Sequence, residues 1–155
     1  NDSTYWLFFE LIWRDFFKYV SMQHKSKFFS IDGIYGNNKE WSTDNNILNK
    51  WINGETEDPF INANMNELSQ TGFMSNRGRQ NVANYLTKEL KIDWRIGAEY
   101  FESLLIDYDV HSNYGNWLYN AGIGNDSMPF RKFNPKLQSE RYDPKKKFEQ
   151  TWLNG

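Results

Sequence analysis

Hydrophobic positions recur at helical spacing along most of the chain, and no stretch keeps the strict alternation that a half-buried strand requires. Residues 4–20 are apolar almost all round, with a few charged residues interspersed, which is the pattern of a largely buried helix. Residues 21–41 have two glycines and no periodicity, so they predict a loop. The apolar residues of this loop are expected to lie against the core: Phe28, Phe29, Ile31 and Ile34.

Capping residues divide the rest of the chain into short helices, because side-chain oxygens at these positions can accept the free N–H groups of a first turn. Helices are expected to begin, in chain order, at Thr43 or Asp44, at Asp58-Pro59, at Ser75 or Asn76, after Asp93, and after Asp109. Prolines 129, 135 and 144 then predict an irregular segment up to residue 148. No repeat and no linker divides the chain. The pattern therefore predicts one all-α domain.

The composition is that of a folded domain, since 39% of the 155 residues are hydrophobic and 18% are aromatic. Seven Trp, nine Tyr and twelve Phe exceed what packing usually needs, so some are expected to face a ligand or carry electrons. A net charge of −2 argues against a generally basic nucleic-acid binder. Residues 131–147 are nevertheless basic and residues 40–67 mainly acidic. A solvated tail is the simpler interpretation of the basic run.

Several classes of site are excluded by composition. Cysteine is absent, which rules out disulfides and thiolate metal sites. The only histidines, His24 and His111, have no ligand spacing, so no metal is expected. No apolar stretch could span a membrane and no signal sequence is visible, so we expect a soluble intracellular protein, with an organelle or the nucleus left open. Because the chain begins inside an apparent helix, we expect a fragment of a longer protein.

Two acids and an amide follow an apolar run in an order that packing alone does not require. Asp109 can cap the helix that follows, and helical spacing puts Asn113, Asn116 and Trp117 on one side of it. A carboxylate, an amide and an indole on one wall suit a large planar polar ligand. An ordinary turn between two helices is the alternative.

The preceding helix offers a second polar surface. Its residues Asn76, Arg79, Gln80 and Ala83 fall at i, i+3, i+4 and i+7, a polar stripe with a small residue that leaves room for a ligand. Arginine at the positive end of a helix needs an anion nearby, and Asp107 is the candidate partner of Arg79. The alternative is an exposed helix face.

The first helix carries a third candidate group. An acid, a flat aromatic and a guanidinium stand at i, i+3 and i+4 as Glu10, Trp13 and Arg14, an arrangement that could recognise a flat base. A Glu–Arg helix pair beside a core tryptophan is the simpler alternative.

Several segments of this sequence are similar to those of a known protein family: WINGETEDPFINANMNELSQTGFMSNRGRQNVANYL, KIDWRIGAEYFESLLIDYDVHSNYGNW, AGIGND, FNP and YDP. They resemble the flavin-binding helical domain of the photolyase and cryptochrome family, and the resemblance covers nearly all of the chain. TGFMSNRGRQNVANYL and GAEYFESLLIDYDVHSNYGNW are most similar to the DASH-type cryptochromes. Residues 1–155 would then be a single domain, the C-terminal portion of an all-α FAD-binding domain whose amino-terminal antenna domain is absent.

The resemblance implies FAD as cofactor, with a methenyltetrahydrofolate antenna in the missing domain as an option. The positions that would hold FAD are Asn76, Arg79, Asp107, Asp109 and Asn113, and Asn113 would face the reactive flavin nitrogen. Trp117, Trp94 and Trp41 match the proximal, middle and distal members of an electron-transfer chain. The positions around a pyrimidine-dimer pocket would be Glu10, Trp13, Arg77, Gln80 and Tyr119, with Glu10 bonding base edges and Trp13 stacking.

The function that the resemblance implies is light-dependent repair of cyclobutane pyrimidine dimers by electron transfer from reduced FAD. Single-stranded DNA would be preferred, because Gln80 and Tyr119 replace the methionine and tryptophan of duplex-acting relatives. A blue-light photoreceptor without repair activity is the alternative, and a helical module without cofactor is a third hypothesis. The Ser/Thr-rich segment that contacts the FAD phosphates in the family has no counterpart here. The 155-residue chain alone is therefore expected to bind FAD weakly, and its oligomeric state is left open.

Overall fold

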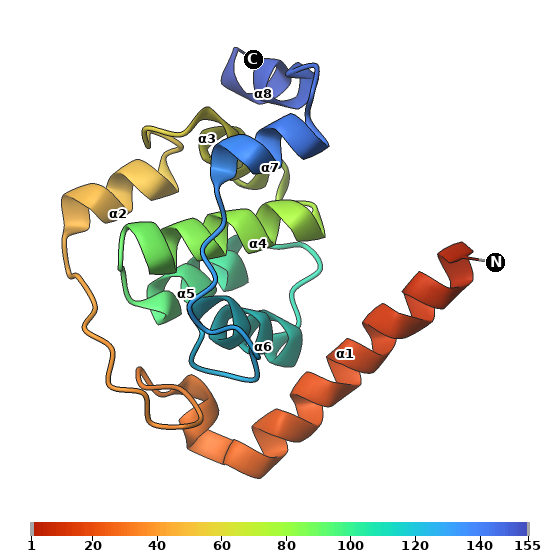
Figure 1. The fold of residues 1–155 in the computed structure, drawn as a ribbon, viewed down its shortest axis with the longest axis vertical. Coiled ribbons are helices and arrows are strands. Elements are labelled where there is room, and N and C mark those ends of the chain that lie inside the picture. The colour runs from red at the N-terminus through yellow and green to blue at the C-terminus, as the bar shows by residue number, and fades with distance from the viewer. Residues whose placement is uncertain (1, 155) are drawn as a thin grey trace.

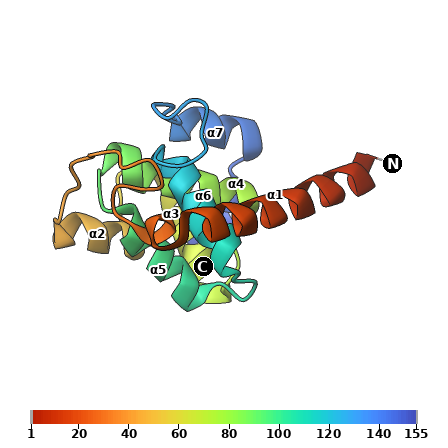
Figure 2. The same cartoon turned by 90° about the horizontal axis from the view of Figure 1, so that it is seen from below.

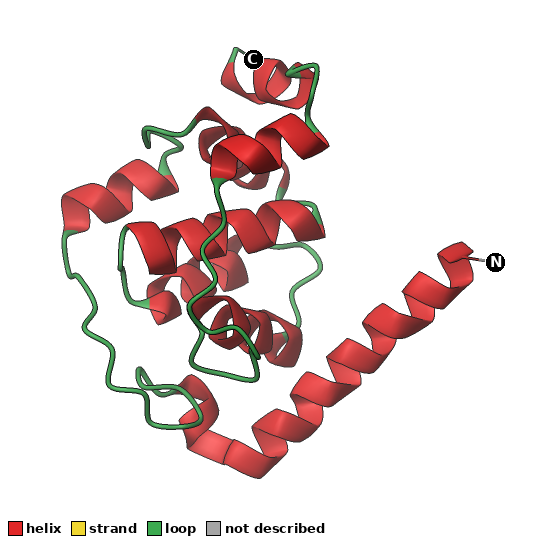
Figure 3. Ribbon diagram, viewed as in Figure 1, coloured by secondary structure: helices red, strands yellow, loops and turns green. Residues whose placement is uncertain are grey.

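The computed structural model describes residues 2–154, and the regular elements of this range are all helical (Figure 3). The α-helices are α1 (Asp2–His24), α2 (Asn45–Ile52), α3 (Pro59–Thr71), α4 (Asn76–Asn84), α5 (Trp94–Leu104), α6 (Val110–Ala121), α7 (Pro135–Tyr142) and α8 (Lys147–Leu153). A 3-10 helix, η1 (Lys25–Phe29), follows α1, and a π-helix, η2 (Tyr85–Glu89), continues α4. The expected all-α fold is confirmed.

Side-chain caps begin the helices where the sequence predicts them. The residues that accept a hydrogen bond from a backbone N–H of the following first turn are Asp44, Asp58, Ser75, Asp93 and Asp109. Each such cap stabilises its helix by about 1 kcal/mol, because it satisfies N–H groups that have no partner within the helix. The chain leaves α3 and α6 through Gly72 and Gly122, whose φ angles of 69° and 70° would strain a side chain.

The core lies where α5 packs on α6 and where α4 packs against α3 and α6 (Figure 1). Its large and almost fully buried side chains include Trp51, Ile61, Met65, Leu68, Leu86, Trp94, Trp117 and Leu118. At the C-terminal end, α8 packs on α3, with the Phe148 ring 6.2 Å from that of Phe60. None of the helices among residues 2–154 is both long and apolar enough to cross a bilayer.

Helix α1 is far more exposed than its sequence pattern predicts. Phe17, Val20 and Ser21, in its C-terminal half, are buried, whereas Trp6 is 58% and Phe8 66% exposed. Figures 1 and 2 show the N-terminal half extending away from the other helices, while the C-terminal half packs on α6 and η1. The prediction of a largely buried helix is wrong for the described residues. An apolar surface becomes buried only where a second surface covers it.

The irregular segment predicted near the C-terminus is also wrong in part, because it contains α7. Pro135 stands at the start of that helix, and the Asn134 side chain accepts a hydrogen bond from the Leu137 N–H at 3.2 Å. A proline in the first turn loses no hydrogen bond, since its nitrogen would have no helical partner there. Phe28 and Ile34 of the predicted loop are buried as expected, but Phe29 remains 42% exposed.

Candidate functional site

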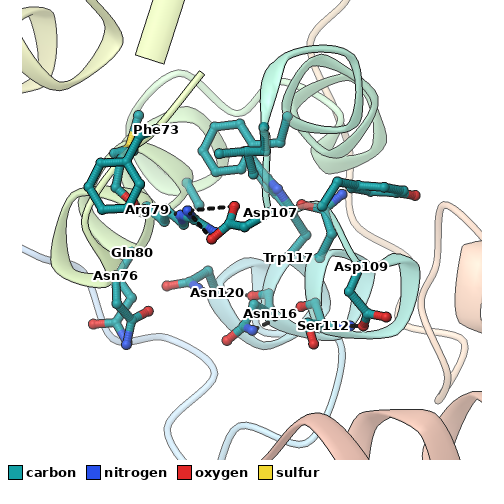
Figure 4. Close-up of a pocket in the computed structure, with 16 residues that line it drawn as sticks. Phe73, Asn76, Arg79, Gln80, Asp107, Asp109, Ser112, Asn116, Trp117 and Asn120 are labelled. Atoms are coloured by element: carbon teal, nitrogen blue, oxygen red, sulfur yellow. Dashed lines mark hydrogen bonds and ion pairs between the residues drawn. The ribbon is translucent and has the colours of Figure 1, made fainter. Parts of the chain in front are cut away.

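A cavity of about 250 Å³ lies between α4, α6 and the connection from α5 to α6 (Figure 4). Its polar lining consists of Asn76, Arg79, Gln80, Asp107, Asp109, Ser112, Asn113, Asn116 and Asn120. Its apolar lining consists of Phe73, Met74, Ala83, Phe101, Leu105, Tyr108 and Trp117. The two polar surfaces predicted from helical spacing, one on α4 and one on α6, therefore line the same cavity.

Arg79 and Asp107 connect the two walls. The Arg79 Nη2 lies 2.9 Å from each carboxylate oxygen of Asp107, and its Nε donates to the Met74 carbonyl at 2.8 Å. The guanidinium also lies over the Phe73 ring, 6.0 Å from its centroid. The predicted contact is present, and it holds the loop before α6 against α4.

Asp109 places a negative charge at the start of α6. Its Oδ1 accepts a hydrogen bond from the Ser112 N–H at 2.8 Å. This backbone hydrogen bond lowers the pKa of Asp109, with further lowering from His111 and Arg14, against a smaller opposing effect of burial. The carboxylate is therefore held ionised at the cavity wall.

Asn113 and Trp117 form the deeper part of the α6 wall. The Asn113 amide donates to the Ala98 carbonyl at 2.9 Å, which fixes its side chain against α5. Trp117 is only 2% exposed, and its ring lies 5.1 Å from that of Phe101. A Cβ at Gly97 would overlap the Trp117 ring, so this glycine gives the indole its place. The sequence analysis did not select Gly97, although a glycine inside a helix is a recognisable signal.

A second cavity, of about 320 Å³, adjoins the first, because Asn76, Gln80 and Asn116 line both. The residues predicted for a substrate pocket all line it: Glu10, Trp13, Arg77, Gln80 and Tyr119. Arg131 and Phe133, which the sequence analysis did not select, also line it.

Contacts among these residues fix the second cavity. The Trp13 and Tyr119 rings lie 6.4 Å apart at 70°, and Arg77 donates to the Gln80 amide oxygen at 2.8 Å. Arg14 pairs with Asp15 at 3.7 Å, so the alternative of a Glu–Arg pair on α1 is wrong. Glu10 is exposed and faces this cavity instead.

The tryptophans predicted to carry electrons differ in depth. Trp117 lines the first cavity, Trp94 is fully buried at the start of α5, and Trp41 is partly exposed. An isolated parallel bridge between Ser42 and Ile92 brings Trp41 beside the segment that leads into Trp94. The spatial order of these three residues stays a prediction.

Two further aromatic partners of these indoles are residues that the sequence analysis did not select. The Trp117 ring lies 6.3 Å from that of Trp51, and the Trp94 ring lies 6.0 Å from that of Tyr114. Both contacts are edge-on.

The lining of the first cavity fits the ring system of a flavin, which has two apolar faces and a polar edge. Apolar side chains and the small Ala83 leave room for a flat ring, while the fixed Asn113 amide and the Asp109 carboxylate offer polar partners. The lining is less suited to a diphosphate. Arg79 is the one cation among the lining residues, and Asp107 neutralises it. Among residues 2–154, no group of His, Cys, Asp and Glu could hold a metal ion.

Comparison with known proteins gives close matches over nearly the whole chain. Residues 6–155 match the family model described as the FAD binding domain of DNA photolyase. The chain is 56% identical over 153 residues to a cryptochrome DASH of Synechocystis sp., and 53% identical to one of Danio rerio, with 99% of the chain covered in each case. It spans 31% and 29% of the length of these two relatives.

Solved structures show the same similarity. The crystal structure of a Synechocystis cryptochrome superimposes with a TM-score of 0.96 at 55% identity, covering 99% of this chain and 32% of that one. An archaeal photolyase from Sulfolobus tokodaii, whose structure has two FAD molecules, superimposes with a TM-score of 0.87 at 40% identity, covering 93% of this chain and 33% of that one.

Proposed function

The chain belongs to the family of the FAD-binding domain of DNA photolyase, and on this premise we propose that it is part of a light-dependent flavoprotein of the cryptochrome DASH type that repairs DNA. FAD is the cofactor. Asp109 and Asn113 would hold the polar edge of the flavin, and the Arg79–Asp107 pair would close the wall beside it. Residues outside this chain would supply the phosphate contacts that the first cavity lacks.

The proposed substrate is a cyclobutane pyrimidine dimer in DNA. When bound, reduced FAD supplies the chemistry, since light drives an electron from it to the dimer, the ring splits and the electron returns. The observation that carries the proposal is the junction of the two cavities at Asn76, Gln80 and Asn116, which would bring an extruded dimer next to the flavin.

The residues of the second cavity have the groups that such a substrate needs. Glu10 offers a carboxylate that can accept hydrogen bonds from base edges, while Trp13 and Tyr119 offer aromatic surface for stacking. Arg77 and Arg131 would neutralise phosphates on the flanking strand. No side chain here has to act as an acid, a base or a nucleophile. The chain would contribute by positioning the dimer and excluding water.

We propose further that the protein acts preferentially on single strands. Extruding a base from a duplex costs a few kcal/mol, because its base pair must be broken, whereas a base in a single strand has no such pair to lose. Around the second cavity, Gln80 and Tyr119 offer amide and hydroxyl groups. These groups would bind an extruded dimer less strongly than larger apolar side chains would.

The test is repair of one defined dimer by the full-length protein, in a single-stranded and in a duplex oligonucleotide. We expect repair in light, loss of most of it in Glu10→Gln, and normal repair in the control Glu140→Gln, since Glu140 is an exposed residue of α7. Absence of repair in both DNA contexts, with FAD bound, would contradict the proposal.

A signalling photoreceptor is the second candidate, and the tryptophans support it because repair by an already reduced flavin does not need them. Trp117, Trp94 and Trp41 would reduce the flavin in light. In the full-length protein, Trp94→Phe should slow this photoreduction without releasing FAD, whereas the control Trp6→Phe, at the exposed end of α1, should change neither. A protein that is photoreduced but repairs no dimer would favour signalling.

A further inference from the structure

Tyr114 of α6 lies against Trp94, one of the proposed electron carriers. Their ring centroids are 6.0 Å apart at 83°, and the Tyr114 ring has a second edge-on contact with Phe29 at 4.9 Å. The Tyr114 hydroxyl donates to the Glu102 carboxylate of α5 at 3.3 Å. Trp94 is fully buried, Tyr114 is half-buried and Glu102 is exposed, so the three residues lead from the core to the surface.

We propose that Tyr114 is an electron donor to oxidised Trp94 and that Glu102 accepts the phenolic proton. The proposal rests on the proposed function, because the oxidant is the light-excited flavin acting through the tryptophans. Tyr114 gives one electron to the Trp94 cation radical, which returns to neutral indole. The phenolic O–H bond breaks and its proton goes to the Glu102 carboxylate. The products are a neutral tyrosyl radical and a protonated Glu102, so the positive and the negative charge are removed together.

A proton acceptor is what makes this step feasible for tyrosine, because an oxidised phenol is a strong acid and a charged phenol radical would be unstable in a half-buried site. Burial, and then the neighbouring Glu102 carboxylate, raise the pKa of Tyr114 to about 12. The phenol therefore stays protonated until the electron leaves. Since Glu102 is exposed, the transferred proton can pass on to water.

A comparison with Tyr100 shows why the site is at Tyr114. Tyr100 lies 5.8 Å from the Trp51 ring, which in turn lies 6.3 Å from the Trp117 ring beside the first cavity. That route is continuous, but within residues 2–154 the Tyr100 hydroxyl has no acceptor, and burial alone raises its pKa. Trp51 already donates its indole N–H to the Val82 carbonyl at 3.2 Å. Tyr100 therefore offers an aromatic contact without a proton acceptor.

The test uses the full-length flavoprotein with the variants Tyr114→Phe and Glu102→Gln, and Tyr100→Phe as the matched control. After a light flash, electron paramagnetic resonance and transient absorption measure the tyrosyl radical. A second measurement uses the same proteins without flavin, in which azide radicals made by pulse radiolysis oxidise tryptophan and the yield of tyrosyl radical is recorded.

In both measurements the tyrosyl radical should form in the unchanged protein and in Tyr100→Phe, and should fall sharply in Tyr114→Phe. Glu102→Gln should slow its formation on the order of a hundredfold, because the glutamine amide cannot take up the phenolic proton. The unchanged far-ultraviolet circular dichroism of each variant would show that the fold is intact.

Two results would overturn the proposal. One is a tyrosyl radical that persists in Tyr114→Phe and disappears in Tyr100→Phe, which would assign the donor to the Trp51 route. The other is flavin photoreduction with no tyrosyl radical, which would leave the proposed function standing. Failure of the flavin to be photoreduced at all would instead count against the proposed function, and the flavin-free measurement would still decide the role of Tyr114.

Discussion

Arg79 and Asp107 are separated by 28 positions in the chain, yet the Arg79 Nη2 lies 2.9 Å from both oxygens of the Asp107 carboxylate. The pair joins α4 to the segment before α6, and among the described residues Asp109 is the lining carboxylate that forms no salt bridge. The two side chains are 26% and 53% exposed, so water screens much of their attraction. The pair is therefore expected to matter more for the shape and charge of the cavity than for global stability.

Asp107→Asn tests this distinction. The free energy of unfolding of the 155-residue chain should fall by about 1 kcal/mol or less, as for other exposed ion pairs. Release of FAD from the full-length protein, followed by flavin fluorescence, should accelerate much more, because the amide would hold Arg79 and the segment before α6 less firmly at the cavity wall. The control Asp15→Asn breaks the exposed Arg14–Asp15 pair and should change neither quantity. Equal rates of FAD release in the two variants would contradict a role of the Arg79–Asp107 pair in shaping the cavity.

Gly97→Ala should displace Trp117, because the added methyl group would overlap the indole ring. Overpacking of this kind costs about 1–3 kcal/mol, although alanine is the better helix former. Urea unfolding gives the stability, and the tryptophan near-ultraviolet circular dichroism reports the displacement. The control Glu99→Ala, an exposed position of the same helix, should change stability by about 0.5 kcal/mol or less. A Gly97→Ala variant as stable as the parent would show that the ring has room to move.

The lowered pKa of Lys88 predicts that the free energy of unfolding increases at alkaline pH. Burial, and then the charge of Lys39, lower its pKa to about 8, and its amine donates to the Ala121 and Pro129 carbonyls. Below that pH both the folded and the unfolded chain hold the proton, and the cost of the buried charge is present in full. Between about pH 8 and the usual lysine value, the unfolded chain holds more protons, so the free energy of unfolding increases with pH.

The increase should be about 1 kcal/mol between roughly pH 7 and 9, since Lys88 is only half-buried. Above this window tyrosines ionise in the unfolded chain, at about pH 10, and oppose the increase. Urea unfolding as a function of pH measures it. Lys88→Met should abolish the slope whatever its effect on stability at neutral pH. Lys39→Met should reduce the slope, because one cause of the lowered pKa is gone. A slope that survives in Lys88→Met would assign it to another group.

The features that could be predicted from the sequence are those that depend on neighbouring residues. Asp58 caps α3 through the Ile61 N–H three residues away, so the signal and its partner lie in the same short segment. The cavity walls were also predictable, because helical spacing places Arg79 and Asn113 on defined faces. What a face packs against was not predictable in this way. Trp6 and Trp51 are both tryptophans in helices, but one is exposed and the other fully buried, and the difference lies in surfaces distant in sequence.

The 155-residue chain alone should bind FAD weakly. In the first cavity, Asp107 neutralises Arg79 and Asp109 is ionised, so a diphosphate would meet net negative charge. Titration of the isolated chain with FAD, followed by flavin fluorescence, should show no saturation at micromolar concentration, while riboflavin, which has no phosphates, should bind no worse than FAD. Tight binding of FAD with weaker binding of riboflavin would mean that the described residues supply phosphate contacts after all.

The preference for single strands should change if the second cavity is made more apolar. Gln80→Met combined with Tyr119→Trp adds apolar surface around the dimer. Burial of that surface against the dimer should strengthen binding by about 25 cal/mol per Å². The substitutions also release Arg77 and Arg131 from the side chains to which they now donate, at 2.8 Å and 3.3 Å. A gain of about 1–2 kcal/mol in the binding free energy of the extruded dimer would offset much of the cost of extruding the bases from a duplex. In the full-length protein, the ratio of duplex to single-strand repair should therefore rise about tenfold, since each 1.4 kcal/mol is a factor of about ten.

Gln70→Met, at an exposed position of α3, is the control and should leave the ratio unchanged. If the double variant repairs both substrates in the original ratio, Gln80 and Tyr119 do not set the preference, and the single-strand specificity would have to arise from other residues.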